Sequence, residues 1–83
     1  MDDDYPQGGG EEARESVERF ERMLEADTLN YISDDELEDI VDYYFNENQP
    51  AKALKAIEIA NKLYPFETVF YLRKAQVLIM LGR

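Results

Sequence analysis

The helical pattern is clearest in the stretch from Ser33 to Pro65, which reads SDDELEDIVDYYFNENQPAKALKAIEIANKLYP. Ser33 is followed three residues later by Glu36, which is the spacing of a capping box at the start of a helix. Ile32 and Leu37 stand at the two positions of a hydrophobic staple, which directs the chain into the helix. A helix is therefore predicted to begin immediately after Ser33.

Apolar residues then recur with helical period on both sides of a polar turn. The first run is Leu37, Ile40, Val41, Tyr44 and Phe45, and the second is Ala53, Leu54, Ile57, Ala60, Leu63 and Tyr64. Residues 46–49 interrupt the pattern, and Pro50 suits the first turn of a new helix, where its missing N–H would have had no partner. Pro65 ends that helix. The stretch is predicted to form a helical hairpin.

One more helix is predicted on each side of this hairpin. The upstream apolar stripe is Ala13, Val17, Phe20 and Leu24, within a helix from Glu11 to about Ala26. The downstream helix, residues 66–81, carries apolar side chains almost all the way round and is closed by Gly82. Together these patterns predict an all-α fold of about four helices.

A helix that is apolar all round needs cover on more than one side. The sequence supplies no further segment to cover the second side of the last helix. We therefore expect that the chain is a fragment of a longer protein or that two copies pair through this helix, and both can hold together. The residues expected at such an oligomer interface are Phe70, Val77, Leu78 and Leu81.

Composition argues against several classes of function. The chain has 83 residues, the length of one small domain, and a net charge of −10, which disfavours nucleic acid and anionic membranes as partners. It has no cysteine and no histidine, so thiolate chemistry, the usual zinc ligands and the base of a catalytic triad are missing. The acidic run Asp34–Asp39 lacks the glycine of a calcium loop. We expect no enzyme activity, no cofactor and no metal site.

The charge is unevenly distributed along the chain. Residues 1–48 hold 17 acidic and 3 basic residues, whereas residues 49–83 hold 2 acidic and 6 basic ones. Solvated helix faces account for such a pattern in many helical proteins. The alternative is an acidic docking face, which would favour a basic partner.

The N-terminal segment, residues 1–10, is poor in apolar residues and is expected to be a disordered tail. It has neither the basic nor the apolar region of a secretion signal. No apolar run approaches the roughly 20 residues that span a bilayer. A cytoplasmic location with no membrane partner is expected.

The segment from Asp34 to Glu67 is 34 residues long, reads as helix, turn and helix, and resembles a tetratricopeptide repeat. The residues that carry the resemblance are Leu37, Ile40, Val41, Tyr44, Ala53, Ile57, Ala60 and Pro65. A shift of 34 residues pairs Leu37 with Tyr71, Val41 with Ala75, and Asn48 with Gly82. The departures are Leu37 in place of tryptophan, Val41 in place of a small residue, and Asn48 in place of the turn glycine. A generic four-helix bundle explains the apolar stripes but not the 34-residue offset.

The resemblance implies antiparallel hairpins that form part of a right-handed superhelix, at the N-terminal end of a longer repeat protein. Residues 11–33 would be a capping helix and its connection, 34–67 one full repeat, and 68–83 the first helix of a second repeat. It implies a non-catalytic module that binds a protein or peptide in a groove. The expected groove residues are Asp35, Glu38, Asp42, Phe45, Asn46, Leu72, Gln76, Ile79 and Met80. Acidic and apolar walls would suit a basic and apolar partner. The alternative is an architectural cap and oligomerisation segment of a longer repeat protein.

Overall fold

The computed structural model describes residues 10–28 and 32–82. This part of the chain holds four helices and no strand: α1 (Gly10–Ala26), α2 (Asp34–Asn46), α3 (Pro50–Leu63) and α4 (Thr68–Met80). The all-α prediction is confirmed, and each helix begins and ends within two residues of its predicted bounds. The tail predicted for residues 1–10 lies outside the described residues, except for Gly10, which already belongs to α1.

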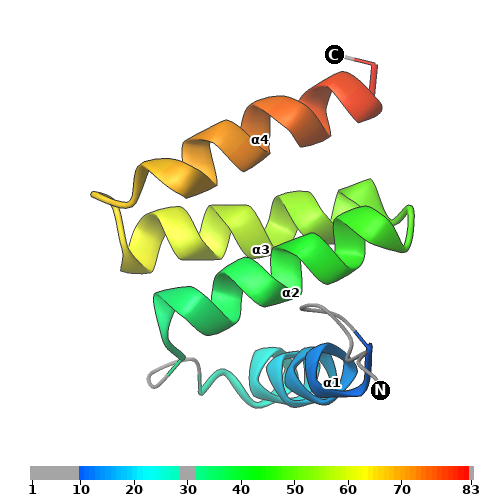
Figure 1. Ribbon diagram of the computed structural model, residues 1–83. Coiled ribbons are helices and arrows are strands. Elements are labelled where there is room, and N and C mark those ends of the chain that lie inside the picture. The colour runs from blue at the N-terminus through cyan, green and yellow to red at the C-terminus, as the bar shows by residue number, and fades with distance from the viewer. Residues whose placement is uncertain (1–9, 29–31, 83) are drawn as a thin grey trace, which may run out of the picture.

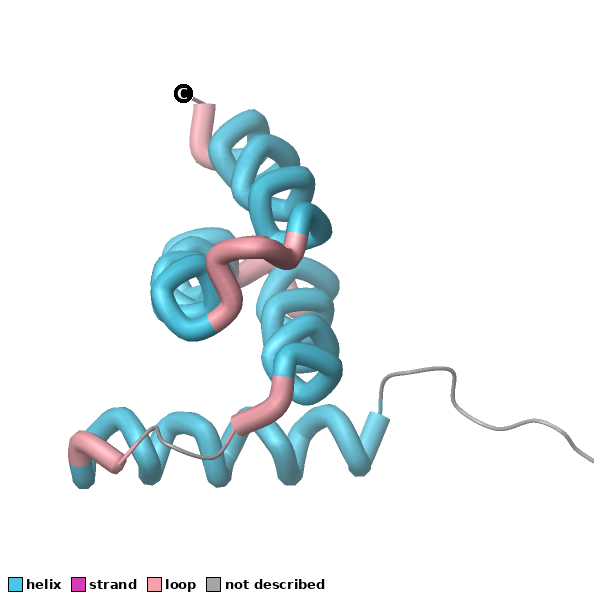
Figure 2. The backbone as a smooth tube through the Cα atoms, turned by 90° about the vertical axis from the view of Figure 1, so that its left-hand side faces the viewer, coloured by secondary structure: helices cyan, strands magenta, loops and turns pink. Residues whose placement is uncertain are grey.

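The four helices are arranged in an order that follows the chain (Figure 1). Helices α2 and α3 form an antiparallel hairpin, and α4 reverses direction again and packs mainly against α3. Helices α2 and α4 therefore run in the same direction. Helix α1 packs against α2 and lies crosswise to the other three (Figure 2). In the described chain, α3 packs between α2 and α4, and α2 packs between α1 and α3.

The hydrophobic core runs through all four helices. Its buried members are Val17, Phe20, Ile32, Leu37, Ile40, Val41, Tyr44, Ala53, Ala56, Ile57, Ala60, Phe70 and Val77. Ala53, Ala56 and Ala60 of α3 are completely buried. Because an alanine side chain is a single methyl group, α2 and α4 can approach the α3 backbone closely. The packing residues predicted for the first hairpin are thus in the core, apart from Pro65, which is exposed in the α3–α4 turn.

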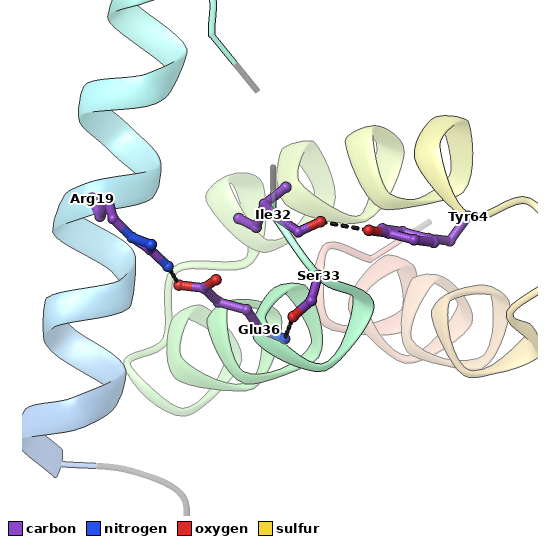
Figure 3. Close-up of polar contacts among 5 residues, drawn as sticks. All are labelled: Arg19, Ile32, Ser33, Glu36 and Tyr64. Atoms are coloured by element: carbon purple, nitrogen blue, oxygen red, sulfur yellow. Dashed lines mark hydrogen bonds and ion pairs between the residues drawn. The ribbon is translucent and has the colours of Figure 1, made fainter. Parts of the chain in front are cut away.

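The start of α2 shows how local sequence signals and tertiary contacts combine (Figure 3). The Ser33 hydroxyl accepts a hydrogen bond of 3.1 Å from the backbone N–H of Glu36, as the capping motif predicts. The Glu36 carboxylate, however, pairs with Arg19 of α1. At the same end of the hairpin, where α3 ends, the Tyr64 hydroxyl donates a 2.6 Å hydrogen bond to the carbonyl of Ile32. The entry to α2 is therefore held by α1 and by the end of α3.

Left-handed residues follow α1, α2 and α4, and the residue after α1 is Asp27, with φ 58°. Asn48, after α2, has φ 59°, and Gly82, after α4, has φ 78°. The N–H of Asn48 donates to the carbonyl of Phe45 at 3.1 Å, and the N–H of Gly82 donates to the carbonyl of Ile79 at 3.0 Å. These are corresponding bonds of the motif that closes a helix with a left-handed residue. The 34-residue offset between Asn48 and Gly82 therefore has a counterpart in the backbone.

Asn48 provides a direct test of this helix end. The Asn48→Gly variant should raise the free energy of unfolding by about 0.5 kcal/mol, because glycine adopts a left-handed conformation without a steric penalty from Cβ. The matched change Asn46→Gly, at the last helical residue of α2, should lower it by about 0.5–1 kcal/mol. Urea unfolding followed by circular dichroism measures both values. Equal changes in the free energy of unfolding for the two variants would contradict the role of Asn48 as the left-handed residue that closes α2.

Candidate interaction surface on α2 and α4

The surface with the strongest case for function combines the outward sides of α2 and α4, and we call it the α2–α4 face. Its members are Asp35, Glu38, Asp42, Phe45 and Asn46 from α2, and Leu72, Gln76, Ile79 and Met80 from α4. Asp35, Asn46, Leu72, Ile79 and Met80 are exposed, and the others are half-buried. All nine residues thus keep some accessible surface on two helices that run in the same direction.

The two helices of this face are joined by a polar bridge. The Nε of Arg73 on α4 donates to Oδ1 of Asp42 on α2 at 2.9 Å. A second nitrogen of the same guanidinium donates to Oε1 of Gln76 at 3.1 Å. Arg73 was not among the predicted site residues, and the sequence does not distinguish it from Lys74, the next residue of the same helix. Because Arg73 pairs with Asp42, the α2 side of the face carries less unpaired negative charge than predicted.

Glu38 is the other electrostatically distinct group of the face. Partial burial, followed by the nearby charge of Asp42, raises the pKa of its carboxyl above the ordinary value, and the nearby Arg73 opposes the rise. Among the described residues, Glu38 has no hydrogen-bond or ion-pair partner. A half-buried carboxylate without a partner is less stable in its ionised form than one in water.

The apolar part of the face lies on α4. Leu72 is 57% exposed, Ile79 76% and Met80 41%. Residues 72, 76, 79 and 80 have the spacing of one helix face, so these three side chains form a strip beside Gln76. Single exposed apolar side chains are ordinary, but a group of three on one side of a helix indicates a contact surface.

The other side of α4 differs from the prediction. Phe70 and Val77, which were expected at an oligomer interface, are completely buried within the chain and are not available to a partner. Tyr71 and Ala75, which the shift of 34 residues pairs with Leu37 and Val41 of the first hairpin, are both exposed, Tyr71 to 49%. A helix with apolar residues all round does not specify which side is covered, and here the line through Phe70 and Val77 is the covered one. The other two interface candidates, Leu78 and Leu81, are half-buried.

A second polar cluster lies where α1, α2 and α3 meet. The hydroxyl of Tyr44 donates a 2.6 Å hydrogen bond to Oε2 of Glu21, and Nζ of Lys52 lies 3.8 Å from the same oxygen. Lys52 also lies 5.9 Å from the centre of the Tyr44 ring. Burial and the bond to Glu21 raise the pKa of the Tyr44 phenol, so that it remains a donor. A cavity of about 310 Å³ lies beside this cluster, lined by Phe20, Glu21, Leu24, Glu25, Tyr44, Lys52 and Lys55. The cluster holds α1 against the hairpin.

Two further observations concern metal ions and membranes. Within residues 10–28 and 32–82, no three carboxylate, imidazole or thiol side chains gather closely enough to hold a metal ion. In the same part of the chain, no helix has the length and apolar character needed to cross a membrane.

The chain was compared with protein-family models, curated proteins and solved structures, and none of them matches it.

The burial of Glu38 leads to a prediction about stability. Glu38→Gln should raise the free energy of unfolding at neutral pH by about 0.5 kcal/mol, because it removes a charge that is better solvated in the unfolded chain. A raised pKa means that the folded protein binds the proton more tightly. The advantage of the variant should therefore disappear below about pH 4, where both states are protonated.

Urea unfolding of the wild type and of Glu38→Gln across this pH range measures the effect. Glu15→Gln, which removes an exposed carboxylate on α1, is the matched control and should show a smaller change. A Glu38→Gln variant that is less stable than the wild type at neutral pH would show that the carboxylate has a stabilising partner.

Proposed function

We propose that this chain is a non-catalytic interaction module whose α2–α4 face binds a protein segment or peptide with basic and apolar residues. The observation that carries the proposal is the exposed strip of Leu72, Ile79 and Met80 on α4, the helix that Arg73 joins to the carboxylate of Asp42 on α2. Full burial of an aliphatic side chain of this size contributes about 1.5–3 kcal/mol. Three such side chains provide enough apolar surface to hold a short segment.

The charges on the face favour a basic partner. Asp35 and Glu38 lie near the start of α2, at the end of the face where α4 also begins, whereas Asp42 lies farther along and contacts Arg73, the neighbour of Leu72. Ile79 and Met80 lie at the opposite end. A bound segment would thus place its basic residues toward the start of the helices and its apolar residues along α4. Complementary charge speeds association and makes binding sensitive to salt.

We infer that the hairpin is of the tetratricopeptide type. The support is the helix, turn and helix of 34 residues and the left-handed residues Asn48 and Gly82, which are 34 positions apart. Helical repeats of this kind bind partners with the helices that line one side of the array. A cytoplasmic location agrees with such a module. The crosswise α1 would act as a terminal cap, which buries one side of the first repeat.

Serine substitutions on α4 test the binding surface. Peptides selected from a random library on the wild-type chain should be enriched in Lys or Arg together with Leu, Ile or Met. Leu72→Ser and Ile79→Ser should each weaken binding of these peptides about tenfold or more, because each removes apolar contact area. Fluorescence anisotropy of labelled peptides measures the affinities.

Phe66→Ser is the matched control, since Phe66 is 92% exposed but lies in the α3–α4 turn, outside the face. The Phe66→Ser variant should bind the selected peptides with the same affinity as the wild type. Selection of acidic peptides, or an equal loss of affinity in the Phe66→Ser variant, would rule out the α2–α4 face as the binding surface.

A second candidate function is an architectural one, in which another helix covers the free side of α4. The observation that favours it is the exposure of Tyr71 and Ala75, whose counterparts 34 residues earlier, Leu37 and Val41, are completely buried in the hairpin. The covering helix would come from a second copy or from a longer chain.

Sedimentation distinguishes the version in which two copies pair. The wild type should dimerise as its concentration rises, and Tyr71→Ser should weaken the dimer because it removes an aromatic contact. The same Phe66→Ser variant serves as the control and should dimerise like the wild type. A monomer at all concentrations would exclude pairing through this side of α4.

A further inference from the structure

We propose that Arg73 determines the charge preference of the α2–α4 face by occupying Asp42, so that a bound segment finds one anionic contact region instead of two. The proposal rests on the proposed function and adds the selectivity of the same surface. The single region that remains is at Asp35 and Glu38.

The contacts of Arg73 leave little capacity at Asp42 for an outside cation. Its guanidinium is held on two sides, by Asp42 at 2.9 Å and by Gln76 at 3.1 Å. The Arg73 side chain is 26% exposed and the Asp42 side chain 37%, so the pair lies partly out of solvent, where a charge-assisted hydrogen bond is stronger. A second cation near Asp42 would also be repelled by Arg73.

Glu38, unlike Asp42, has no basic side chain paired with it among the described residues. It is half-buried, it has no partner among the described residues, and its acidic neighbours Asp35, Asp39 and Asp42 outnumber the one nearby arginine. Asp35 is exposed at the same end of α2. A lysine or arginine from a partner would supply the missing counter-charge there.

The distance between Glu38 and Asp42 along α2 matches the spacing of two basic residues in an extended peptide. Glu38 and Asp42 are one helical turn apart, about 6 Å along α2. Alternate residues of an extended peptide are separated by about 6.6 Å. Two lysines with one residue between them would therefore reach both carboxylates if Arg73 did not hold Asp42. Arg73 restricts the face to segments that combine a single basic position with apolar residues.

Two short synthetic peptides test the proposal. The first peptide contains two leucines and one lysine. The second peptide is identical except that a serine two positions from this lysine is replaced by a second lysine. Amide chemical shifts of α2 and α4 during titration report the affinity of each peptide for the intact chain. Binding to the wild type should differ between the peptides by less than about twofold, because Arg73 offsets the gain from the second lysine.

Arg73→Gln should bind the peptide with two lysines at least about threefold more tightly than the peptide with one, because Asp42 becomes available. Arg73→Lys keeps the positive charge and should retain the wild-type ratio. The double variant Arg73→Gln with Asp42→Asn should lose the new preference, which would assign it to the Asp42 carboxylate.

If Arg73→Gln binds both peptides and the ratio of their affinities equals that of the wild type, the role of Arg73 is overturned and the proposed function is left intact. Absence of binding of either peptide to the wild type would overturn both. If Arg73→Gln does not fold, Asp42→Asn provides an independent measurement. In this variant the Arg73 guanidinium is no longer paired with a carboxylate, and its positive charge should lower the affinity for the peptide with one lysine about threefold. An unchanged affinity would overturn the proposal.

Discussion

The close packing of α3 between its two neighbours is the constraint on which the rest of the structure depends. Ala53, Ala56 and Ala60 leave room for the larger side chains of α2 and α4. Because both helices pack against α3 and each runs opposite to it, α2 and α4 run in the same direction. This arrangement brings Asp42 of α2 within hydrogen-bond distance of Arg73 of α4. The candidate interaction surface is thus a consequence of how α3 packs.

The α2–α4 face retains groups that lower the stability of the folded chain. Glu38 lies partly buried among other acids, which raises the pKa of its carboxyl, and three large apolar side chains are exposed. A stability-optimised surface would replace these groups with solvated or neutral ones. Functional surfaces commonly retain such unfavourable features because a partner relieves them on binding. Arg73 relieves part of the repulsion within the chain itself.

The candidate site shows where prediction from sequence ends. The tetratricopeptide resemblance predicted Leu72, Ile79 and Met80 as groove residues, and all three side chains are exposed on α4, where their spacing places them on one side of the helix. The contribution of Arg73 could not be predicted in the same way, because its partner Asp42 is 31 residues away and on another helix. For the same reason the sequence did not distinguish the buried Phe70 from the exposed Tyr71.

The sequence by itself determined the four helices of the described residues and, to within two residues, where each begins and ends. Ser33, Pro50 and Asn48 act through bonds and dihedral angles within a few residues, and such signals do not need the rest of the fold. Only the tertiary structure decided the crosswise position of α1, the covered side of α4 and the partner of Arg73. These depend on which surfaces pack most closely, and packing is settled between segments that are distant in the chain.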